Sequence, residues 1–277
     1  MVRRLAEAGH RVTVWNRTRA VADTVASGNV TVAEQPSKAV AAADVVLVVL
    51  ASGVVTQAVL LDNEVVAAIR PNAIVCDLGT SGPTAASTIS AALGAAGKRF
   101  VDAPVSGSVP TVAAGQLLIM ASGDAADIAD LAPVLEAFAR LVIRVGPAGS
   151  GQAMKLAVNL IVHQLNSAVS EALVMATRAG IAADAAYDVF QASVIGAPFV
   201  QYKRAAFLAE DVPVAMSLDL TAKDLGLITG FADSLGLQAS AARAVRAEVD
   251  AACAAGFGGR DMADLFQFLA AQSANRG

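Results

Sequence analysis

Asn16, Arg17 and Thr18 directly follow a short stretch, residues 11–15, whose pattern predicts a strand. In a doubly wound sheet, ligands bind outside the carboxyl ends of the strands, and the residue that ends the second strand commonly contacts the ribose of a dinucleotide. An acidic residue there would favour the free 2′-hydroxyl of NAD, whereas the Arg17 guanidinium can pair with a 2′-phosphate and Thr18 can add a hydroxyl donor. The three residues therefore favour NADP, and a solvated polar turn is the alternative.

The elements that would position this turn alternate between strands and helices as far as residue 146, which is typical of a parallel sheet covered on both faces. The predicted strands cover residues 11–15, 30–32, 45–50, 73–77, 99–102, 116–121 and 141–145, and the helices between them include residues 19–27, 36–43, 83–96 and 125–138. Only helical patterns follow, at residues 152–180, 182–193, 217–235, 239–256 and 262–273. We therefore expect an α/β, doubly wound Rossmann-type domain over residues 1–147. An all-α domain for substrate binding and oligomerisation, entered by a long interdomain helix, would occupy residues 148–277.

The chain opens within a helical pattern. Met1, Leu5 and Ala8 share one helix face, and Gly9 supplies a C-terminal stop. A dinucleotide-binding fold requires a first strand and a turn of the form GxGxxG before such a helix. We therefore expect Met1 to lie inside the first Rossmann helix, so that the printed chain lacks the first strand and the glycine turn.

Composition narrows the class of protein. The 277 residues carry a net charge of −4 and only 4% aromatic residues, without a basic cluster, which argues against nucleic-acid binding. Although 56% of the residues are hydrophobic, each apolar run is too short to span a bilayer, and no signal-peptide pattern opens the chain. Cys76 and Cys253 lack the spacing of a metal site or a disulfide framework. We expect a cytoplasmic protein with a small-molecule partner and neither a bound metal nor a membrane association.

Two stretches carry a resemblance to a known family. Residues 100–124 read FVDAPVSGSVPTVAAGQLLIMASGD, and residues 146–159 read GPAGSGQAMKLAVN. With the helix, the strand and the Asn-Arg-Thr turn before them, they make the chain resemble the β-hydroxyacid dehydrogenases. This family includes 3-hydroxyisobutyrate dehydrogenase and the NADPH-dependent glyoxylate and succinic semialdehyde reductases. The resemblance covers essentially the whole chain, and two long motifs in the right order are more specific than one glycine pattern.

The resemblance implies a substrate site in the DAPVSG segment, where Ser106 and Gly107 would hold a substrate carboxylate. Backbone N–H groups in a tight glycine turn and a hydroxyl can bind an anion without a formal charge of their own. A plain turn between a strand and a helix is the alternative. The chain has Ser108 and Thr111 where glycines are common in the family, which leaves the substrate preference open.

The resemblance also implies that Lys155 is the catalytic lysine and Asn159 its partner. Residues four apart lie on one helix face, so both side chains would project together. Carbonyl reduction needs a proton at the oxygen as hydride reaches the carbon, and a lysine can supply it if burial and nearby positive charge weaken its hold on the proton. Asn159 would keep the lysine or the substrate in register. The apolar neighbours of Lys155 indicate a buried stretch, where an unpaired charge would be costly without a function.

Further contacts follow from the same resemblance. The segment SLDLTAKDLGL, residues 217–227, implies that Lys223 reaches the substrate or the cofactor. In the first domain, the residues expected at strand ends on the nicotinamide side of the cofactor are Leu50, Ser52 and Thr80.

Two other polar residues are given structural interpretations. Asp224 follows Lys223, and we expect it to form a cap or a local pair. His163 follows Lys155 by eight residues and has turned about 80° away from it around the helix, so we expect a packing or subunit-interface residue.

Two hypotheses from different classes fit the sequence. The first is an oxidoreductase that transfers a hydride between NADPH and a small 3-hydroxyacid or short semialdehyde acid, with a lysine as general acid/base, in a homodimer or homotetramer. The second is a non-catalytic or cofactor-impaired family member that serves as an assembly or sensing module, and the missing glycine turn motivates it. Imine reductases share the architecture but usually lack the lysine, so Lys155 favours a carbonyl or alcohol substrate.

Overall fold

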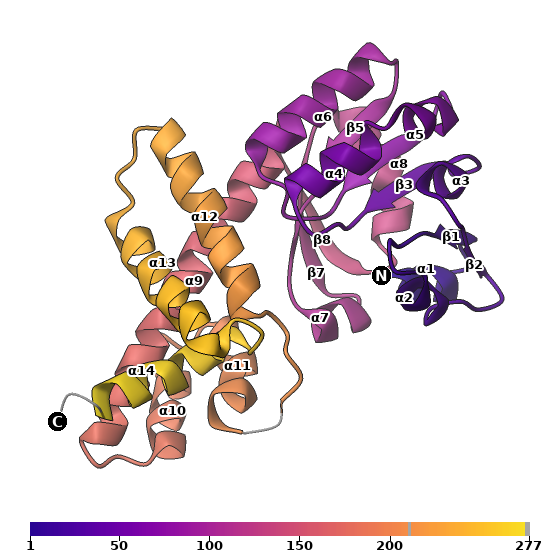
Figure 1. The fold of residues 1–277 in the computed structure, drawn as a ribbon. Coiled ribbons are helices and arrows are strands. Elements are labelled where there is room, and N and C mark those ends of the chain that lie inside the picture. Colours follow the sequence, from indigo (N-terminus) through magenta and orange to yellow (C-terminus); the bar gives the residue numbers. More distant parts are fainter. Residues whose placement is uncertain (210–211, 275–277) are drawn as a thin grey trace. The chain divides into compact units, whose positions relative to one another are not determined.

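The computed structural model describes residues 1–209 and 212–274, and contacts divide the chain into two compact units, Met1–Lys155 and Leu156–Gly277. The first unit contains strands and helices, and the second contains helices (Figure 1). This order confirms the predicted fold class, a Rossmann-like α/β sheet followed by a helical part. In the part of the chain that the structure describes, no helix combines the length and the apolar character that crossing a bilayer requires.

The first unit is built on a six-stranded sheet. Its strands are β3 (Val45–Val48), β4 (Ile74–Asp77), β5 (Arg99–Asp102), β6 (Val105–Ser106), β7 (Leu117–Ser122) and β8 (Ala139–Gly146). The order is β3-β4-β5-β7-β6, and β8 pairs with β7. Strands β3, β4 and β5 run parallel, so their carboxyl ends meet at one edge of the sheet. Two further strands, β1 (Val12–Val14) and β2 (Val30–Val32), form a separate parallel pair.

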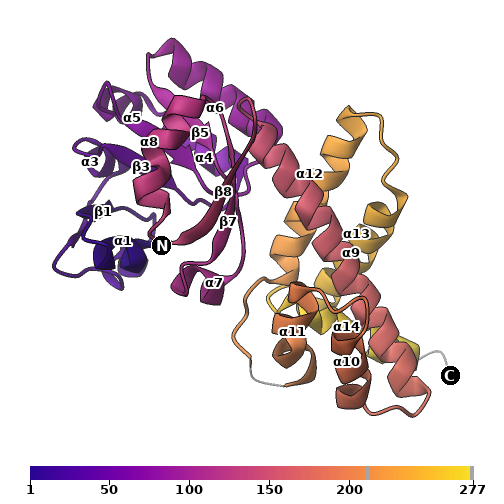
Figure 2. The same ribbon diagram turned by 180° about the vertical axis from the view of Figure 1, so that it is seen from behind.

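Helices cover both faces of the six-stranded sheet. The helices of this unit are α1 (Val2–Glu7), α2 (Arg19–Asp23), α3 (Pro36–Val40), α4 (Gly53–Leu60), α5 (Asn63–Ala68), α6 (Pro83–Ala95), α7 (Val109–Ala113) and α8 (Ala125–Leu135). Every residue of β4 is buried: Cys76 packs in a cluster with Leu131 of α8, whereas Val75 packs with Ile89 of α6 on the other face. Figures 1 and 2 show α4, α5 and α6 on one side of the sheet and α8 on the other. Burial on both faces explains the continuous apolar runs in the sequence.

The second unit is a helical bundle. Its elements are the remainder of α9 (Ser150–Arg178), then α10 (Ala183–Ala192), α11 (Pro198–Leu208), α12 (Leu218–Ser234), α13 (Ser240–Ala252), the π-helical turn η1 (Cys253–Phe257), the 3₁₀ turn η2 (Met262–Asp264) and α14 (Leu265–Ala274). Helix α9 begins in the first unit and continues into the second. The core contains Leu173, Tyr187, Leu225 and Val249, which come from α9, α10, α12 and α13.

Helix α9 buries a polar face. Asn159, His163, Asn166 and Ser170 recur at helical spacing and are each at most 6% exposed. The same helix also buries apolar side chains, because Leu156, Val169 and Leu173 lie in the core, whereas Ile161 is 65% exposed. The buried side of α9 is therefore partly polar, unlike that of the usual amphipathic helix, in which the apolar stripe faces the core.

Candidate functional site

The Asn16–Thr18 turn leads from the carboxyl end of β1 into α2. The Asn16 Oδ1 atom accepts a hydrogen bond from the backbone N–H of Thr18 at 2.9 Å, and all three residues of the turn are exposed. Arg19 forms ion pairs with Asp23 and Glu34, whereas Arg17 has no hydrogen bond or ion pair with any other described residue. The Arg17 guanidinium is therefore available to a ligand at a strand end.

The other three residues of the first unit that are predicted to contact a cofactor lie after the parallel strands β3 and β4, at the edge where the carboxyl ends of these strands meet. Leu50 and Thr80 are half-buried. Ser52 caps α4, because its Oγ accepts the N–H of Val55 at 3.4 Å. Between them, a Cβ on Gly79 would lie 3.4 Å from the Leu50 carbonyl oxygen, so the two strand ends approach closely. The structure thus brings these three predicted residues together.

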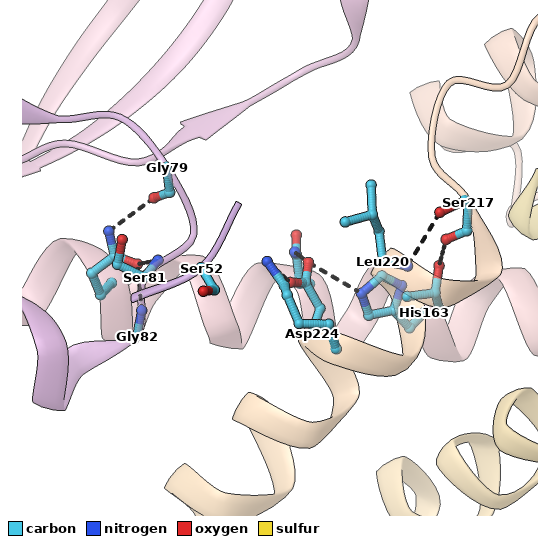
Figure 3. Close-up of polar contacts among 12 residues, drawn as sticks. Ser52, Gly79, Ser81, Gly82, His163, Ser217, Leu220 and Asp224 are labelled. Carbon is cyan, nitrogen blue, oxygen red and sulfur yellow. Dashed lines mark hydrogen bonds and ion pairs between the residues drawn. The ribbon is translucent and has the colours of Figure 1, made fainter. Parts of the chain in front are cut away.

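The buried side chain of Gln152, in the first turn of α9, bonds the loop after β4 at three backbone groups. Its Oε1 accepts the backbone N–H groups of Ser81 and Gly82 at 3.0 and 3.1 Å, and its Nε2 donates to the Gly79 carbonyl at 2.9 Å (Figure 3). This amide therefore helps to fix the loop that contains Thr80, together with Asp77, which accepts the Gly79 N–H. The prediction from sequence missed Gln152, although its place three residues before Lys155 in the GPAGSGQAMK motif was a signal.

Asp102, at the end of β5, anchors the N-terminus of α9. Its Oδ1 accepts the Gly149 N–H at 2.8 Å and the Ser122 hydroxyl at 2.5 Å, and its Oδ2 accepts the Gln152 N–H at 3.0 Å. The Ser122 oxygen in turn accepts the Gly151 N–H at 2.9 Å. The first N–H groups of a helix lack acceptors within the helix. Here Asp102 accepts the N–H of Gln152, and Ser122 accepts the N–H of Gly151. The Asp of the DAPVSG segment is therefore a helix anchor for the helix that carries Lys155.

A second buried carboxylate lies beside Asp102. Asp77 is its register partner on β4, and its Oδ1 accepts the Gly79 N–H at 2.9 Å while its Oδ2 has no hydrogen-bond partner among the described residues. Burial raises the pKa of Asp77, and the neighbouring Asp102 adds to that effect. Burial also raises the pKa of Asp102, against the lowering effect of its hydrogen bonds.

The predicted anion-binding turn contains Ser106 in β6 and Gly107 directly after it. Gly107 has φ +137°, and a Cβ there would lie 2.6 Å from Leu117 Cδ2, so the turn requires glycine. Ser108 and Thr111, the two departures from the family pattern, form a local cap. The Ser108 N–H donates to Thr111 Oγ1 at 3.1 Å, and the two hydroxyl oxygens lie 3.3 Å apart. These departures therefore rigidify the start of α7.

Lys155 and Asn159 lie four residues apart on α9 and differ in burial. Asn159 is 6% exposed, whereas Lys155 is half-buried. Met154 is 42% exposed and Ala157 is exposed as well. The expectation that apolar neighbours bury this stretch is confirmed for Leu156, which is 2% exposed in the core, and wrong for Met154 and Ala157.

In the second unit, Asp224 lies next to three polar side chains, those of Asn159, Lys223 and His163. Its Oδ2 accepts the Asn159 Nδ2 at 2.7 Å, the Lys223 Nζ lies 3.1 Å from its Oδ1, and the His163 Nε2 lies 3.9 Å from its Oδ2 (Figure 3). Burial alone would raise the pKa of Asp224, but His163 and Lys223 together hold it below its ordinary value. His163 is 1% exposed within the chain itself, which favours the packing alternative over the subunit interface.

Comparison with known proteins places the chain in a family. Residues 1–146 match the family model for the NAD binding domain of 6-phosphogluconate dehydrogenase, and residues 149–269 match that for the NAD-binding part of NADP-dependent 3-hydroxyisobutyrate dehydrogenase. The chain belongs to the β-hydroxyacid dehydrogenase family.

Individual members of this family cover nearly the whole chain. The solved structure of Mycobacterium tuberculosis 3-hydroxyisobutyrate dehydrogenase with L-serine is 30% identical, with a TM-score of 0.84 over 97% of this chain and 94% of that one. Glyoxylate/succinic semialdehyde reductase 1 of Arabidopsis thaliana is 28% identical over 95% of this chain and 91% of its own length. The NAD-dependent L-serine dehydrogenase of Pseudomonas aeruginosa is 30% identical over 82% of this chain and 79% of its own length.

The first unit of this β-hydroxyacid dehydrogenase is thus an NAD(P)-binding domain of an oxidoreductase. The structure adds three polar residues that the sequence did not assign to the site, namely Asp102, Gln152 and Asp224, with Asp224 interpreted only as a local partner. Each of the three forms a hydrogen bond between two segments that lie at least 47 residues apart in the chain, and at least one of the two segments carries a predicted site residue.

Proposed function

We propose that this β-hydroxyacid dehydrogenase transfers a hydride between NADPH and a small 3-hydroxyacid or short semialdehyde acid. The observation that carries the proposal is that α9 places Lys155 one turn before Asn159, whose buried amide is oriented by Asp224. The names of its relatives support the substrate class, since they act on hydroxyacids, semialdehydes and serine.

Lys155 is the general acid in reduction and the general base in oxidation. NADPH, when bound, would supply the hydride, and the Lys155 ammonium gives its proton to the carbonyl oxygen. The Asn159 Nδ2 donates to Asp224, so the Oδ1 is the acceptor atom of this oriented amide. That oxygen can accept a hydrogen bond from the lysine or from the substrate hydroxyl, so it keeps the proton donor in register.

The residues at the strand ends fit a dinucleotide phosphate. Asn16 shapes the turn, the Arg17 guanidinium has no partner among the described residues, and Thr18 is exposed beside it. A guanidinium pairs well with a phosphate, so we assign this turn to the 2′-phosphate of NADP. Leu50, Ser52 and Thr80 would contact the nicotinamide side.

The substrate carboxylate is assigned to Ser106 and Gly107, with Lys223 as a cationic contact to substrate or cofactor. Gly107 leaves no room for a Cβ, so the turn presents its backbone and the Ser106 hydroxyl. The helical part of the chain, residues 148–277, is assigned to substrate binding and to assembly as a homodimer or homotetramer. The exposed apolar residues Ile161 and Met175 on α9 support an assembly surface.

Turnover of candidate substrates tests the catalytic assignment. NADPH oxidation is followed with glyoxylate, succinic semialdehyde, tartronate semialdehyde and methylmalonate semialdehyde. Lys155→Ala should lower kcat about 10²- to 10⁴-fold, the contribution typical of a general acid, while the Kd of NADPH stays within about twofold. Lys38→Ala, an exposed lysine on α3, serves as the matched control. Equal loss of turnover and cofactor affinity would make Lys155 structural, and NADPH binding without any turnover would favour a non-catalytic module.

Cofactor choice is tested at Arg17. Arg17→Gln should raise the Kd of NADPH about 10- to 100-fold, because a hydrogen bond to a charged group contributes about 1.5–3 kcal/mol, and it should leave the Kd of NADH unchanged. Arg19→Gln is the matched control, since Arg19 is exposed but already paired. An equal effect of Arg17→Gln on both cofactors would refute the phosphate contact.

A further inference from the structure

The buried polar face of α9 holds a cluster of atoms without hydrogen-bond partners among the described residues. They are both ring nitrogens of His163, the Oδ1 of Asn166 and the Oδ1 of Asp224, whose one close contact is the Lys223 ammonium. All three residues are at most 3% exposed. A buried polar atom without a partner costs free energy, so a cluster of them calls for an explanation.

The neighbours of the His163 ring are acceptors. Asn166 donates its Nδ2 to the Met262 carbonyl at 2.9 Å, which leaves its Oδ1 as the free end. Asp224 presents a carboxylate 3.9 Å from the His163 Nε2. His163 and Asn166 are three residues apart and therefore neighbours on one helix face. A neutral imidazole has one N–H and can serve one acceptor, whereas an imidazolium has two and can serve both.

We propose that His163 is a positioning residue that works as an imidazolium, with its Nε2–H directed to Asp224 and its Nδ1–H to Asn166. In this role it keeps Asp224 ionised and fixed, and Asp224 holds the amide of Asn159. The effect on catalysis rests on the proposed function. The protonation of the His163 ring and the fixed position of the Asn159 side chain are independent of it.

The charges around the ring are consistent with a buried cation. The charged groups on the elements packed here include Asp224 and Lys223 on α12, Asp261 and Asp264 at η2, Lys203 on α11, Glu248 and Arg246 on α13 and Glu171 on α9 itself. Lys203 and Asp261 pair with each other at 2.5 Å, and Glu248 bonds Ser167 at 2.7 Å. Asp224 is thus the carboxylate left to share between His163 and Lys223. A paired charge is far less costly to bury than an isolated one.

Nitrogen NMR tests the charge of the ring directly. The chain contains two histidines, His10 and His163, so ¹⁵N-histidine labelling gives two pairs of ring-nitrogen signals, and His10→Gln assigns them. We expect both ring nitrogens of His163 to be protonated at pH 7, and Asp224→Asn to remove one proton at the same pH. A neutral ring in the wild-type protein would overturn the proposal, and so would a charge that Asp224→Asn leaves unchanged. The wild-type spectrum decides the first point even if the variant does not fold.

His163→Gln tests the positioning role. The side-chain amide protons of Asn159 should exchange at least tenfold faster in this variant, because Asp224 loses its cationic support. With NADPH and a substrate, kcat should fall about tenfold at an unchanged Kd of NADPH. Ser170→Ala is the matched control on the same buried face, since its hydroxyl bonds only the Asn166 carbonyl at 2.8 Å.

The outcomes separate the two proposals. Unchanged Asn159 exchange and an unchanged kcat in His163→Gln would refute the positioning role. If the wild-type protein shows the imidazolium and ordered Asn159 but turns over no substrate, the proposed function fails while the role of His163 stands.

Discussion

Replacing Asp102 by asparagine asks whether the end of β5 holds the start of α9. Asp102 is fully buried, and its two oxygens accept three hydrogen bonds, from Ser122, Gly149 and Gln152. Asparagine has the same shape but offers one acceptor oxygen and one amide donor. If the amide oxygen of the new asparagine keeps the hydrogen bonds from Ser122 and Gly149, its NH₂ group must face the N–H of Gln152. Both groups are donors, so the bond to Gln152 is lost.

The magnitude follows from this arrangement. A buried N–H without an acceptor costs about 1–3 kcal/mol, and a neutral acceptor weakens the two bonds that survive. Burial raises the pKa of Asp102, so removing the charge recovers part of its desolvation cost. We expect a net loss of about 2 kcal/mol in the local stability of the first turn of α9, which is about 30-fold in its opening equilibrium.

Hydrogen exchange measures that opening. Peptides covering residues 149–156 should exchange about 30-fold faster in Asp102→Asn. Asp77→Asn is the matched control, because Asp77 is the register partner of Asp102 and is equally buried but bonds no N–H of α9. Its exchange over residues 149–156 should stay within about threefold of wild type. A folded Asp102→Asn protein with unchanged exchange there would refute the anchoring role, as would an equal effect of both variants.

Three further predictions concern stability. Gly107→Ala should lower the stability in thermal unfolding by about 2 kcal/mol, because φ is +137° and the new Cβ would meet other side chains. Gly9→Ala is the control, with φ +89° and open space around it, and should cost about 1 kcal/mol. Equal losses in the two variants would refute the steric argument. Lys203→Met should cost about 3–5 kcal/mol in urea unfolding at pH 7, because it leaves the buried Asp261 without its cation. Lys203 and backbone N–H groups hold the pKa of Asp261 below its ordinary value despite burial. The stabilisation by the Lys203–Asp261 pair is therefore present at neutral pH and is lost as pH falls toward and through the folded pKa. A cost of Lys203→Met that does not depend on pH would contradict this reasoning. Burial raises the pKa of Asp77, so its ionisation removes stability as pH rises from its ordinary value through the raised one; Asp77→Asn should abolish that decline in a pH series of unfolding, and an unchanged series would contradict it.

The regular elements of the fold were predictable from local patterns. Strands at residues 30–32 and 99–102 occur as predicted, and the long helix predicted over residues 152–180 is α9. The prediction missed α11, and its buried Lys203 shows why. A lysine interrupts an apolar pattern, and its burial depends on Asp261, 58 residues away, which no local window contains.

The site was predictable only in part for a related reason. Family motifs indicate Lys155 and Asn159, which stay predictions of function. The partners that hold the site segments, Asp102 for the first turn of α9 and Asp224 for Asn159, depend on pairs 47 to 65 residues apart. The polar residues that α9 buries mislead in addition, because an apolar stripe normally marks the buried side. Sequence patterns therefore indicate the acting residues more readily than the residues that position them.

The isolation of Arg17 has a consequence for how this protein can evolve. Its side chain is exposed and supports no other described residue, so its replacement should change the free energy of unfolding by less than about 0.5 kcal/mol. Asp102 has the opposite character, because a change there disturbs a helix. If Arg17 makes the proposed contact, a substitution at this one exposed position can change the coenzyme preference without a compensating change in the fold. The same substitution is open to natural selection and to protein engineering.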